Sequence, residues 1–270
     1  MRKPLRLASY TMTLLASLVF FIPLYMVVIN SFKTRREAGF FSISLPSDWQ
    51  FENYLEVFKS ANILRAFNNG LIISVGSGII IILLASLAAY VLGRSRKQWA
   101  PVLYYLFLSG LVIPVAFIPT YLVLEYMSLL NSYAGLILVA ATYGLPMSIF
   151  LYTGFVKTIP RELDEAAVLE GCPPLTFFLQ ILFPLMKPVT MTLVVFNFVG
   201  SWNDIQIPLY FSSSDKWALP LTVYNFYGAH ASSWNLIFAD IVITILPLLL
   251  LYLFAQKYIT AGMTAGAVKS

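Results

Sequence analysis

The chain has 270 residues, of which 59% are hydrophobic and only 11% are charged, and its mean hydropathy is +0.81. Soluble domains carry about 25% charged residues, so these polar groups cannot cover a folded surface, and we predict a membrane protein. One cysteine, Cys172, and one histidine, His230, exclude a disulfide framework and a zinc site built from several such ligands. We expect His230 to lie in an external loop. The formal charge of +5 does not indicate nucleic-acid binding, since Lys and Arg lie mostly at predicted membrane edges.

Six apolar stretches are long enough to cross a bilayer, which requires about 20 residues in a helix. The stretches are continuously apolar rather than alternating, and this favours helices over barrel strands. The sequence therefore predicts an all-α membrane bundle with six transmembrane helices, at approximately 10–29, 71–93, 102–124, 133–156, 189–206 and 236–254.

The N-terminal basic residues, within 2–6, precede an apolar run that is too long for the core of a secretory signal and contains Pro23. We interpret this run as the first span, with its basic end in the cytoplasm. Six spans then place both termini in the cytoplasm. The whole chain is expected to form one transmembrane domain, 1–270, with an external loop at 31–69 that holds an amphipathic surface stretch at 51–67, a cytoplasmic loop at 157–188 and a cytoplasmic tail at 255–270.

The cytoplasmic loop carries the signals of a short, sharply bounded helix. Pro160 suits a first helical turn, and acidic residues at 162, 164 and 165 place negative charge near the positive end of the helix. Gly171 suits the left-handed residue after the last turn, and Pro173 prevents continuation. A second short amphipathic piece, 175–182, follows. Helix signals alone do not distinguish a docking element from an ordinary surface helix.

The spacing within this loop resembles the Glu-Ala-Ala loop of ABC-importer permeases. The family pattern has seven fixed positions, and at one of them Phe183 replaces the usual Leu, which is an apolar exchange. A chance match of six residues at fixed spacing is on the order of one in a million per start site. The other six positions match the family: Glu165, Ala166, Ala167, Gly171, Ile181 and Pro184.

Further motifs look like the carbohydrate-uptake branch of these permeases, and more particularly its smaller, maltose-permease-like type. They follow the family order over nearly the whole chain, although Gly70 departs from the Ser usual before the second span. The short N-terminus and six spans resemble the smaller of two unlike permeases that form a heterodimer. The matching segments are 30–33, 51–54, 201–204, 256–258 and 266–269.

This resemblance implies a coupling helix seated in a cleft of a cytoplasmic ATPase, whose closure on ATP turns the spans outward. Glu165 would contact the ATPase, Ala166 and Ala167 would permit close approach, and Gly171 would allow the turn. The tail from Gly262 to Lys269 would touch the ATPases. The full coupling set implied is Asp164, Glu165, Ala166, Ala167, Leu169, Gly171, Ile181 and Pro184.

The resemblance also implies a set of partners in a bacterial or archaeal cytoplasmic membrane. These are a second permease, two copies of the ATPase and an extracytoplasmic solute-binding protein. ATP and Mg would be bound by the ATPase, because this chain has no phosphate-binding Gly-x-x-x-x-Gly-Lys-Ser/Thr loop. The chain itself is expected to be a transporter subunit without a cofactor and not an enzyme.

Polar residues around the last two spans form a candidate substrate path. Amides and an aromatic face suit a sugar, whose hydroxyls take hydrogen bonds and whose ring faces stack. Helix–helix hydrogen bonding and an interfacial Trp explain the same residues without a ligand. The candidates are Asn197, Trp202, Asn203, Asp204 and Asp240.

The main alternative is an ion-gradient-driven secondary transporter of a small polar solute. It requires an ionisable relay near mid-membrane, for which Asp240 is the one candidate. The spans contain no Lys or Arg, and this disfavours a strongly anionic substrate. The sequence leaves open whether the solute is an oligosaccharide, a monosaccharide, a polyol or glycerol phosphate.

Overall fold

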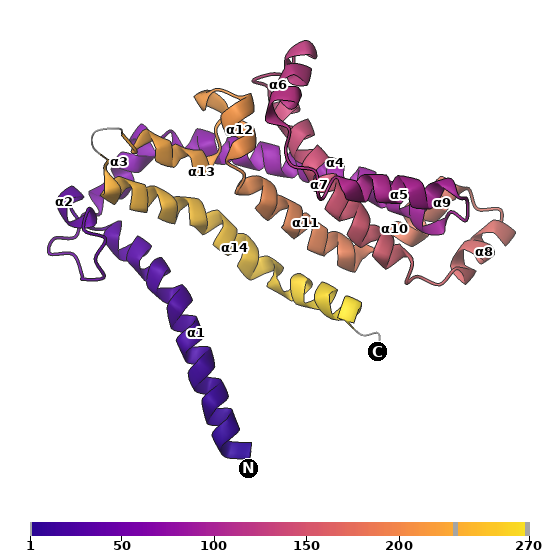
Figure 1. Cartoon of the computed structure of the whole chain (residues 1–270), viewed down its shortest axis with the longest axis horizontal. Helices are drawn as coiled ribbons and strands as arrows, with labels where there is room; N and C mark the ends of the chain where they lie inside the picture. The colour runs from indigo at the N-terminus through magenta and orange to yellow at the C-terminus, as the bar shows by residue number, and fades with distance from the viewer. Residues whose placement is uncertain (1, 229–231, 268–270) are drawn as a thin grey trace. The chain divides into compact units, whose positions relative to one another are not determined.

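The computed structural model describes residues 2–228 and 232–267, so His230 and the last residues of the tail motif lie outside the described part (Figure 1). The described residues form helices and turns without a strand. The long elements are α1 (Arg2–Asn30), α4 (Ile63–Arg94), α5 (Trp99–Ser109), α6 (Phe117–Tyr126), α7 (Tyr133–Val156), α11 (Lys187–Trp202) and α14 (Trp234–Ala267). The short ones are α2 (Arg35–Ala38), α3 (Glu52–Ser60), α8 (Glu162–Leu169), α9 (Pro174–Phe177), the π-helical turn η1 (Phe178–Leu182), α10 (Phe183–Leu185), α12 (Gln206–Phe211), η2 (Ser214–Lys216), α13 (Leu219–Thr222) and η3 (Val223–Asn225).

Four helices in the described residues are long and apolar enough to cross a membrane, namely α1, α4, α7 and α14. They correspond to the first, second, fourth and sixth predicted spans, and α7 has the predicted bounds. A fifth crossing is obtained only if the bent pair Pro174–Leu185 and Lys187–Trp202 is counted as one span. The chain is therefore a multi-pass helical membrane protein, and the predicted count of six is not reproduced by continuous helices.

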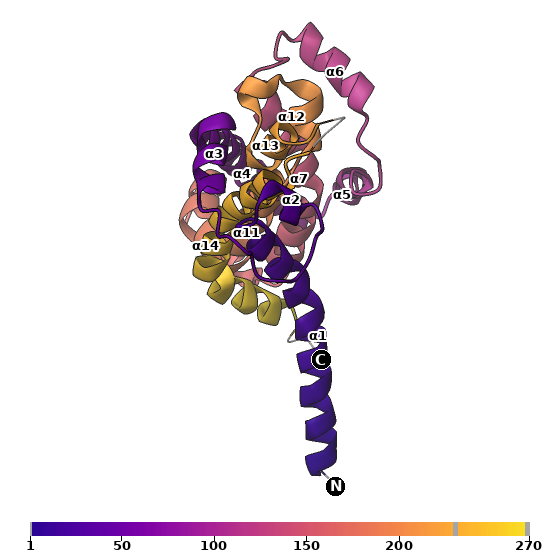
Figure 2. The same ribbon diagram turned by 90° about the vertical axis from the view of Figure 1, so that its left-hand side faces the viewer.

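The prediction of a continuous third span over 102–124 is wrong. The structure divides it into α5 and α6, joined by the non-helical stretch 110–116 (Figure 2). Pro114 lies in this stretch, where it removes a backbone donor and disfavours helical geometry at the preceding residue. Helices of 11 and 10 residues are each too short to cross a bilayer, which requires about 20 residues.

The predicted fifth span, 189–206, is also altered. Its helix α11 begins at Lys187 and ends at Trp202, and it meets the preceding helical segment at an angle of 77°. Met186 leaves helical geometry at the break, with φ −78° and ψ 2°. Pro188 follows in the first turn of α11, where its missing N–H is tolerated.

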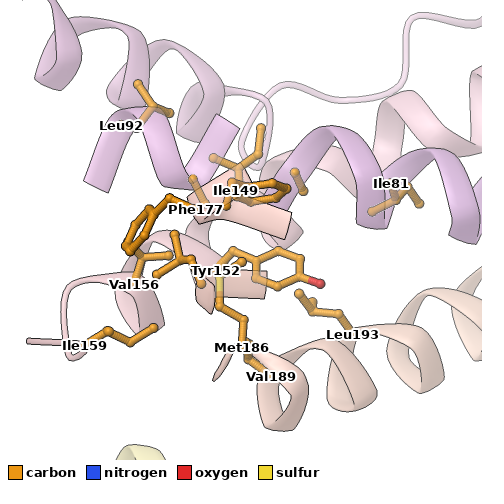
Figure 3. Packing of buried hydrophobic residues seen from close by; sticks show 14 of the residues in the cluster. Ile81, Leu92, Ile149, Tyr152, Val156, Ile159, Phe177, Met186, Val189 and Leu193 are labelled. Carbon is orange, nitrogen blue, oxygen red and sulfur yellow. The ribbon is translucent and has the colours of Figure 1, made fainter. Parts of the chain in front are cut away.

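The chain divides into two compact units, Met1–Phe67 with Leu219–Leu248 and Asn68–Ala218 with Leu249–Ser270. In the second unit, α4, α7 and α11 contribute to one hydrophobic cluster (Figure 3). Tyr152 of α7 is fully buried there, and its hydroxyl donates to Thr190 Oγ1 at 2.8 Å. Thr190 Oγ1 in turn donates to the carbonyl of Met186 at 2.9 Å. The buried hydroxyls therefore have partners, as buried polar groups require.

In the first unit, a buried lysine organises the segment after α1. Lys33 is 1% exposed, and its Nζ donates to Asn30 Oδ1 at 3.0 Å and to the carbonyl and hydroxyl of Ser42 at 2.9 and 2.8 Å. Burial lowers the pKa of this ammonium group. The amphipathic stretch predicted at 51–67 is not one helix, because Asn62 has a φ of 48° and separates α3 from α4.

We expect the close approach of α4 and α7 to make Gly93 sensitive to substitution. A Cβ on Gly93 would lie 2.9 Å from Cγ1 of Val156, whose side chain is fully buried. Gly93→Val should lower the melting temperature in detergent by about 5 °C, because overpacking costs about 1–3 kcal/mol and each 1 kcal/mol shifts Tm by about 2–4 °C at this size. Gly154→Val in α7 is the control, since no atom lies within 4 Å of its Cβ position. Equal losses in both variants would contradict this packing.

Candidate functional site

The helix α8 is built by local signals of its own sequence. Its first turn holds Glu162, Asp164 and Glu165, whose negative charges are favourable at a helix N-terminus. Its last turn is closed by two hydrogen bonds, from Cys172 N to the carbonyl of Ala167 at 2.9 Å and from Gly171 N to that of Val168 at 3.1 Å. Gly171 has a φ of +68°, the left-handed conformation expected from the sequence.

The two faces of α8 differ in their surroundings. Ala167 is 8% exposed and belongs to the hydrophobic cluster of its own unit. Val168 and Leu169 are 75% and 88% exposed, and Glu165 and Ala166 are also exposed. The small side chain of Ala167 thus lets α8 approach its own chain, whereas Ala166 faces outward.

Asp164, which the resemblance places in the coupling set, pairs within its own chain. Its Oδ2 lies 2.9 Å from NH2 of Arg94, the last residue of α4. Sequence reasoning missed Arg94, because the residue stands among other basic residues at a predicted membrane edge. Nothing in the spacing of the sequence connects positions 70 residues apart.

The second piece of the loop is less regular than expected. The predicted stretch 175–182 begins as α9 and continues as the π-helical turn η1, in which Phe183 N donates to the carbonyl of Phe178. Pro184 has no N–H for the next helical hydrogen bond, and this favours the wider turn. Ile181 and Pro184 are exposed, while Phe183 packs against the cluster.

A cavity of about 190 Å³ lies between α4, α7, α11 and α12 in the second unit. Its lining combines an amide, a carboxylate, a hydroxyl and a phenol with apolar side chains, and it contains no Lys or Arg. The lining residues are Ile81, Ala140, Tyr143, Gly144, Phe196, Asn197, Gly200, Ser201, Asp204 and Ile207.

The structure brings two of the five candidate path residues to this cavity. Asn197 is held by its Nδ2, which donates to Ser148 Oγ at 3.0 Å and to the carbonyl of Leu193 at 2.9 Å. Asp204 Oδ1 accepts a hydrogen bond from Ile207 N at 2.9 Å. Tyr143 and Ser201 were not candidates. Tyr143 stands in no motif, and Ser201 belongs to the matching segment 201–204 but was not singled out beside Trp202, Asn203 and Asp204.

The other three candidates lie elsewhere. Trp202 is 1% exposed, and its ring stacks on Phe198 with centroids 5.6 Å apart. Asn203 is exposed and is not among the lining residues. Asp240 belongs to the first unit, where it is 1% exposed and both its oxygens lie 2.9 Å from Thr222 Oγ1.

Known proteins match this chain over nearly its full length. A starch degradation products transport system permease protein, AmyC, of Thermoanaerobacterium thermosulfurigenes is 34% identical over 100% of both chains. The melibiose/raffinose/stachyose import permease protein MelC of Bacillus subtilis is 34% identical over 95% of both. The diacetylchitobiose uptake system permease protein NgcG of Streptomyces coelicolor is 32% identical over 97% of this chain and 88% of its own.

The fold also matches a solved structure. A chain in the crystal structure of a bacterial ABC transporter involved in the import of the acidic polysaccharide alginate superposes with a TM-score of 0.79. It is 19% identical and the match covers 96% of this chain and 98% of that one, so the likeness establishes the fold. Residues 80–265, which include α8 and the cavity, match a family described as the binding-protein-dependent transport system inner membrane component. The chain belongs to this family and is a permease subunit of a binding-protein-dependent importer.

Proposed function

We propose that this permease couples the closure of a cytoplasmic ATPase to alternating access of its membrane spans, and that α8 is the element on which the ATPase docks. The observation that carries this proposal is an exposed, sharply terminated helix at the Glu-Ala-Ala spacing of the family. Its ends are fixed by the acidic first turn and by the left-handed Gly171. A helix whose two ends are fixed can transmit a displacement from a partner without unwinding at its ends.

The exposed face of α8 has the chemistry of a docking surface. Val168 and Leu169 project apolar side chains from a loop outside the spans, and each fully buried side chain of this size is worth about 1.5–3 kcal/mol. Glu165 lies one turn before Leu169 and adds a carboxylate beside them. The complementary surface is a cleft with an apolar floor and basic groups at its rim.

The assembly that follows contains a second permease, two copies of the ATPase and an extracytoplasmic solute-binding protein. ATP and Mg bind to the ATPase, and this chain contributes transport without catalysis. Docking on α8 requires the loop to face the cytoplasm of a bacterial or archaeal cell. With the six crossings expected from the sequence, both termini lie on that side, and the basic residues before the first span support the same orientation.

The solute we propose is a sugar or oligosaccharide. The three relatives named above are called permeases for starch degradation products, for melibiose, raffinose and stachyose, and for diacetylchitobiose. The cavity supports the same class, because Asn197, Ser201 and Asp204 supply hydrogen-bonding groups for hydroxyls. Its lining offers no cation for a strongly anionic solute.

Charge reversal at Glu165 tests the docking role. Glu165→Lys should leave membrane insertion intact but shed the ATPase when the tagged chain is purified gently from native membranes, because it brings a like charge to the basic rim of the cleft. The co-purifying proteins are identified by mass spectrometry. Glu125→Lys makes the same change at an exposed site on α6, away from the loop, and should retain the ATPase.

The same purification separates the proposed function from the secondary-transporter alternative. A second permease and an ATPase should accompany the unaltered chain. A chain that purifies alone and drives uptake in liposomes with an ion gradient would refute the coupling role and favour the alternative.

A substitution at Asn197 tests the cavity as part of the substrate path. In the reconstituted importer, Asn197→Leu should reduce uptake of radiolabelled maltotriose, raffinose or diacetylchitobiose about 5- to 150-fold, since a lost hydrogen-bonding partner costs about 1–3 kcal/mol. Ser148→Ala is the matched control, because it removes the same interhelical hydrogen bond and leaves the amide at the cavity. Equal losses in the two variants would assign Asn197 to helix packing alone.

A further inference from the structure

The last residue of α4 binds the entrance of the loop that carries α8. Arg94 NH1 donates to the carbonyl of Ile159 at 3.0 Å, and its NH2 donates to that of Pro160 at 3.4 Å. NH2 also lies 2.9 Å from Asp164 Oδ2. Two of these acceptors belong to the chain that leads into α8, and the third belongs to the first turn of α8. One guanidinium therefore contacts both the preceding segment and the helix.

The setting of this contact distinguishes it from an ordinary surface ion pair. The side chains of Arg94 and Asp164 are 11% and 25% exposed, whereas fully exposed pairs contribute about 0–1 kcal/mol. Two backbone carbonyls share the same guanidinium, whose planar array of donors suits several acceptors at fixed positions. An ammonium group has no such array.

The remaining contacts of the same helix end lie on both sides of Arg94. The ring of Tyr90, one turn earlier, lies 6.2 and 5.6 Å from those of Phe177 and Phe178, which follow α8 in the chain. Gly93 lets Val156, at the end of α7, come close. The last turn of α4 thus contacts the chain before α8 and the chain after it.

Stabilisation of α8 by itself does not explain a cation at this place. A helix N-terminus carries partial positive charge and favours anions, so the guanidinium of Arg94 opposes the dipole of α8. Asp164 offsets that repulsion while it holds the arginine. The arrangement fits a connection between two helices better than a helix cap.

The other part of α4 reaches the cavity. Ile81 lines it, and Arg94 follows 13 positions later in the same continuous helix, a distance of about 20 Å at 1.5 Å per residue. A displacement of α8 that is passed to Arg94 therefore moves the wall of the cavity. The connection consists of a single helix and the three polar contacts of Arg94.

We propose that Arg94 is a positioning residue that makes α8 and α4 move as one body, so that movement of the docked ATPase reaches the cavity through α4. This rests on the docking role proposed for α8. It adds a specific link on the side of the permease, formed with Asp164 and the carbonyls of Ile159 and Pro160.

The test measures the number of oligosaccharide molecules imported for each ATP hydrolysed. The intact importer that co-purifies with this chain is reconstituted with its binding protein and supplied with radiolabelled maltotriose, raffinose and diacetylchitobiose. Arg94→Gln should retain the ATPase and its hydrolysis, while import per ATP falls about two- to thirtyfold, the range for residues that carry coupling between sites. Arg96→Gln, two residues further and exposed, should match the unaltered importer.

Two milder variants should give intermediate losses of import per ATP. Asp164→Asn removes the charge pairing and leaves both carbonyl contacts, so its loss should be smaller than that of Arg94→Gln. Arg94→Lys keeps the charge without the planar donors and should also be intermediate. If Arg94→Gln does not assemble, these two variants decide, and import per ATP equal to that of the unaltered importer in both would overturn the proposal.

A distance measurement tests the mechanical claim separately. Spin labels at Ile79 of α4 and at Glu170, the residue that caps the C-terminus of α8, are placed in a chain with Cys172→Ser, and both labelled positions are exposed. Their separation should stay constant between the nucleotide-free and ATP-bound importer, and it should change or broaden on ATP binding when Arg94→Gln is added. An unchanged separation in Arg94→Gln overturns the link. Absence of ATP-dependent uptake in the unaltered importer would instead refute the proposed function itself.

Discussion

Helices within a bilayer gain little by exchanging lipid contacts for contacts with one another, so they associate through close packing and a few polar contacts. In the second unit, α4 and α7 meet this requirement where glycine removes a side chain. Gly93 of α4 leaves room for Val156, and Gly144 of α7 leaves room for Ile81. A Cβ on Gly144 would overlap the isoleucine side chain. The hydrophobic cluster then fills the space beside these contacts. Both candidate sites in this unit depend on where α4 is held.

The two sites lie at different positions along α4, and the coupling role proposed for this helix rests on that separation. Ile81 lines the cavity together with residues of α7, α11 and α12, whereas Arg94 contacts the loop around α8. A helix without proline or a Gly/Ser pair is a stiff connection, and α4 contains neither between Ile81 and Arg94. A partner that moves α8 therefore acts on the cavity through backbone that does not bend readily.

Local signals predicted the parts of this fold whose geometry is itself local. The acidic first turn of α8 and the left-handed Gly171 after its last turn are both as predicted. Pro160, however, lies before the N-cap Arg161 and not in the first turn, because the helix begins at Glu162. The broken third span could not be predicted from proline alone. Pro23, Pro146 and Pro247 lie inside continuous helices, as membrane helices tolerate, whereas Pro114 lies in a break. Which proline interrupts a helix depends on the contacts that surround it, and hydropathy averages do not contain them.

The sites themselves were less predictable, because they depend on the rotation of each helix. Asn197 and Trp202 were equal candidates from sequence, yet the first faces the cavity and the second stacks inside the unit. The same geometry divides the paired alanines of α8. Successive residues of a helix with 3.6 residues per turn point about 100° apart, so Ala166 and Ala167 cannot serve one surface equally. Ala167 packs inward and fixes the distance of α8 from its own chain, and Ala166 leaves the outer face smooth beside Glu165. If the proposed docking holds, this pair of small residues satisfies two constraints, packing of α8 on its own chain through Ala167 and close approach of the partner through Ala166.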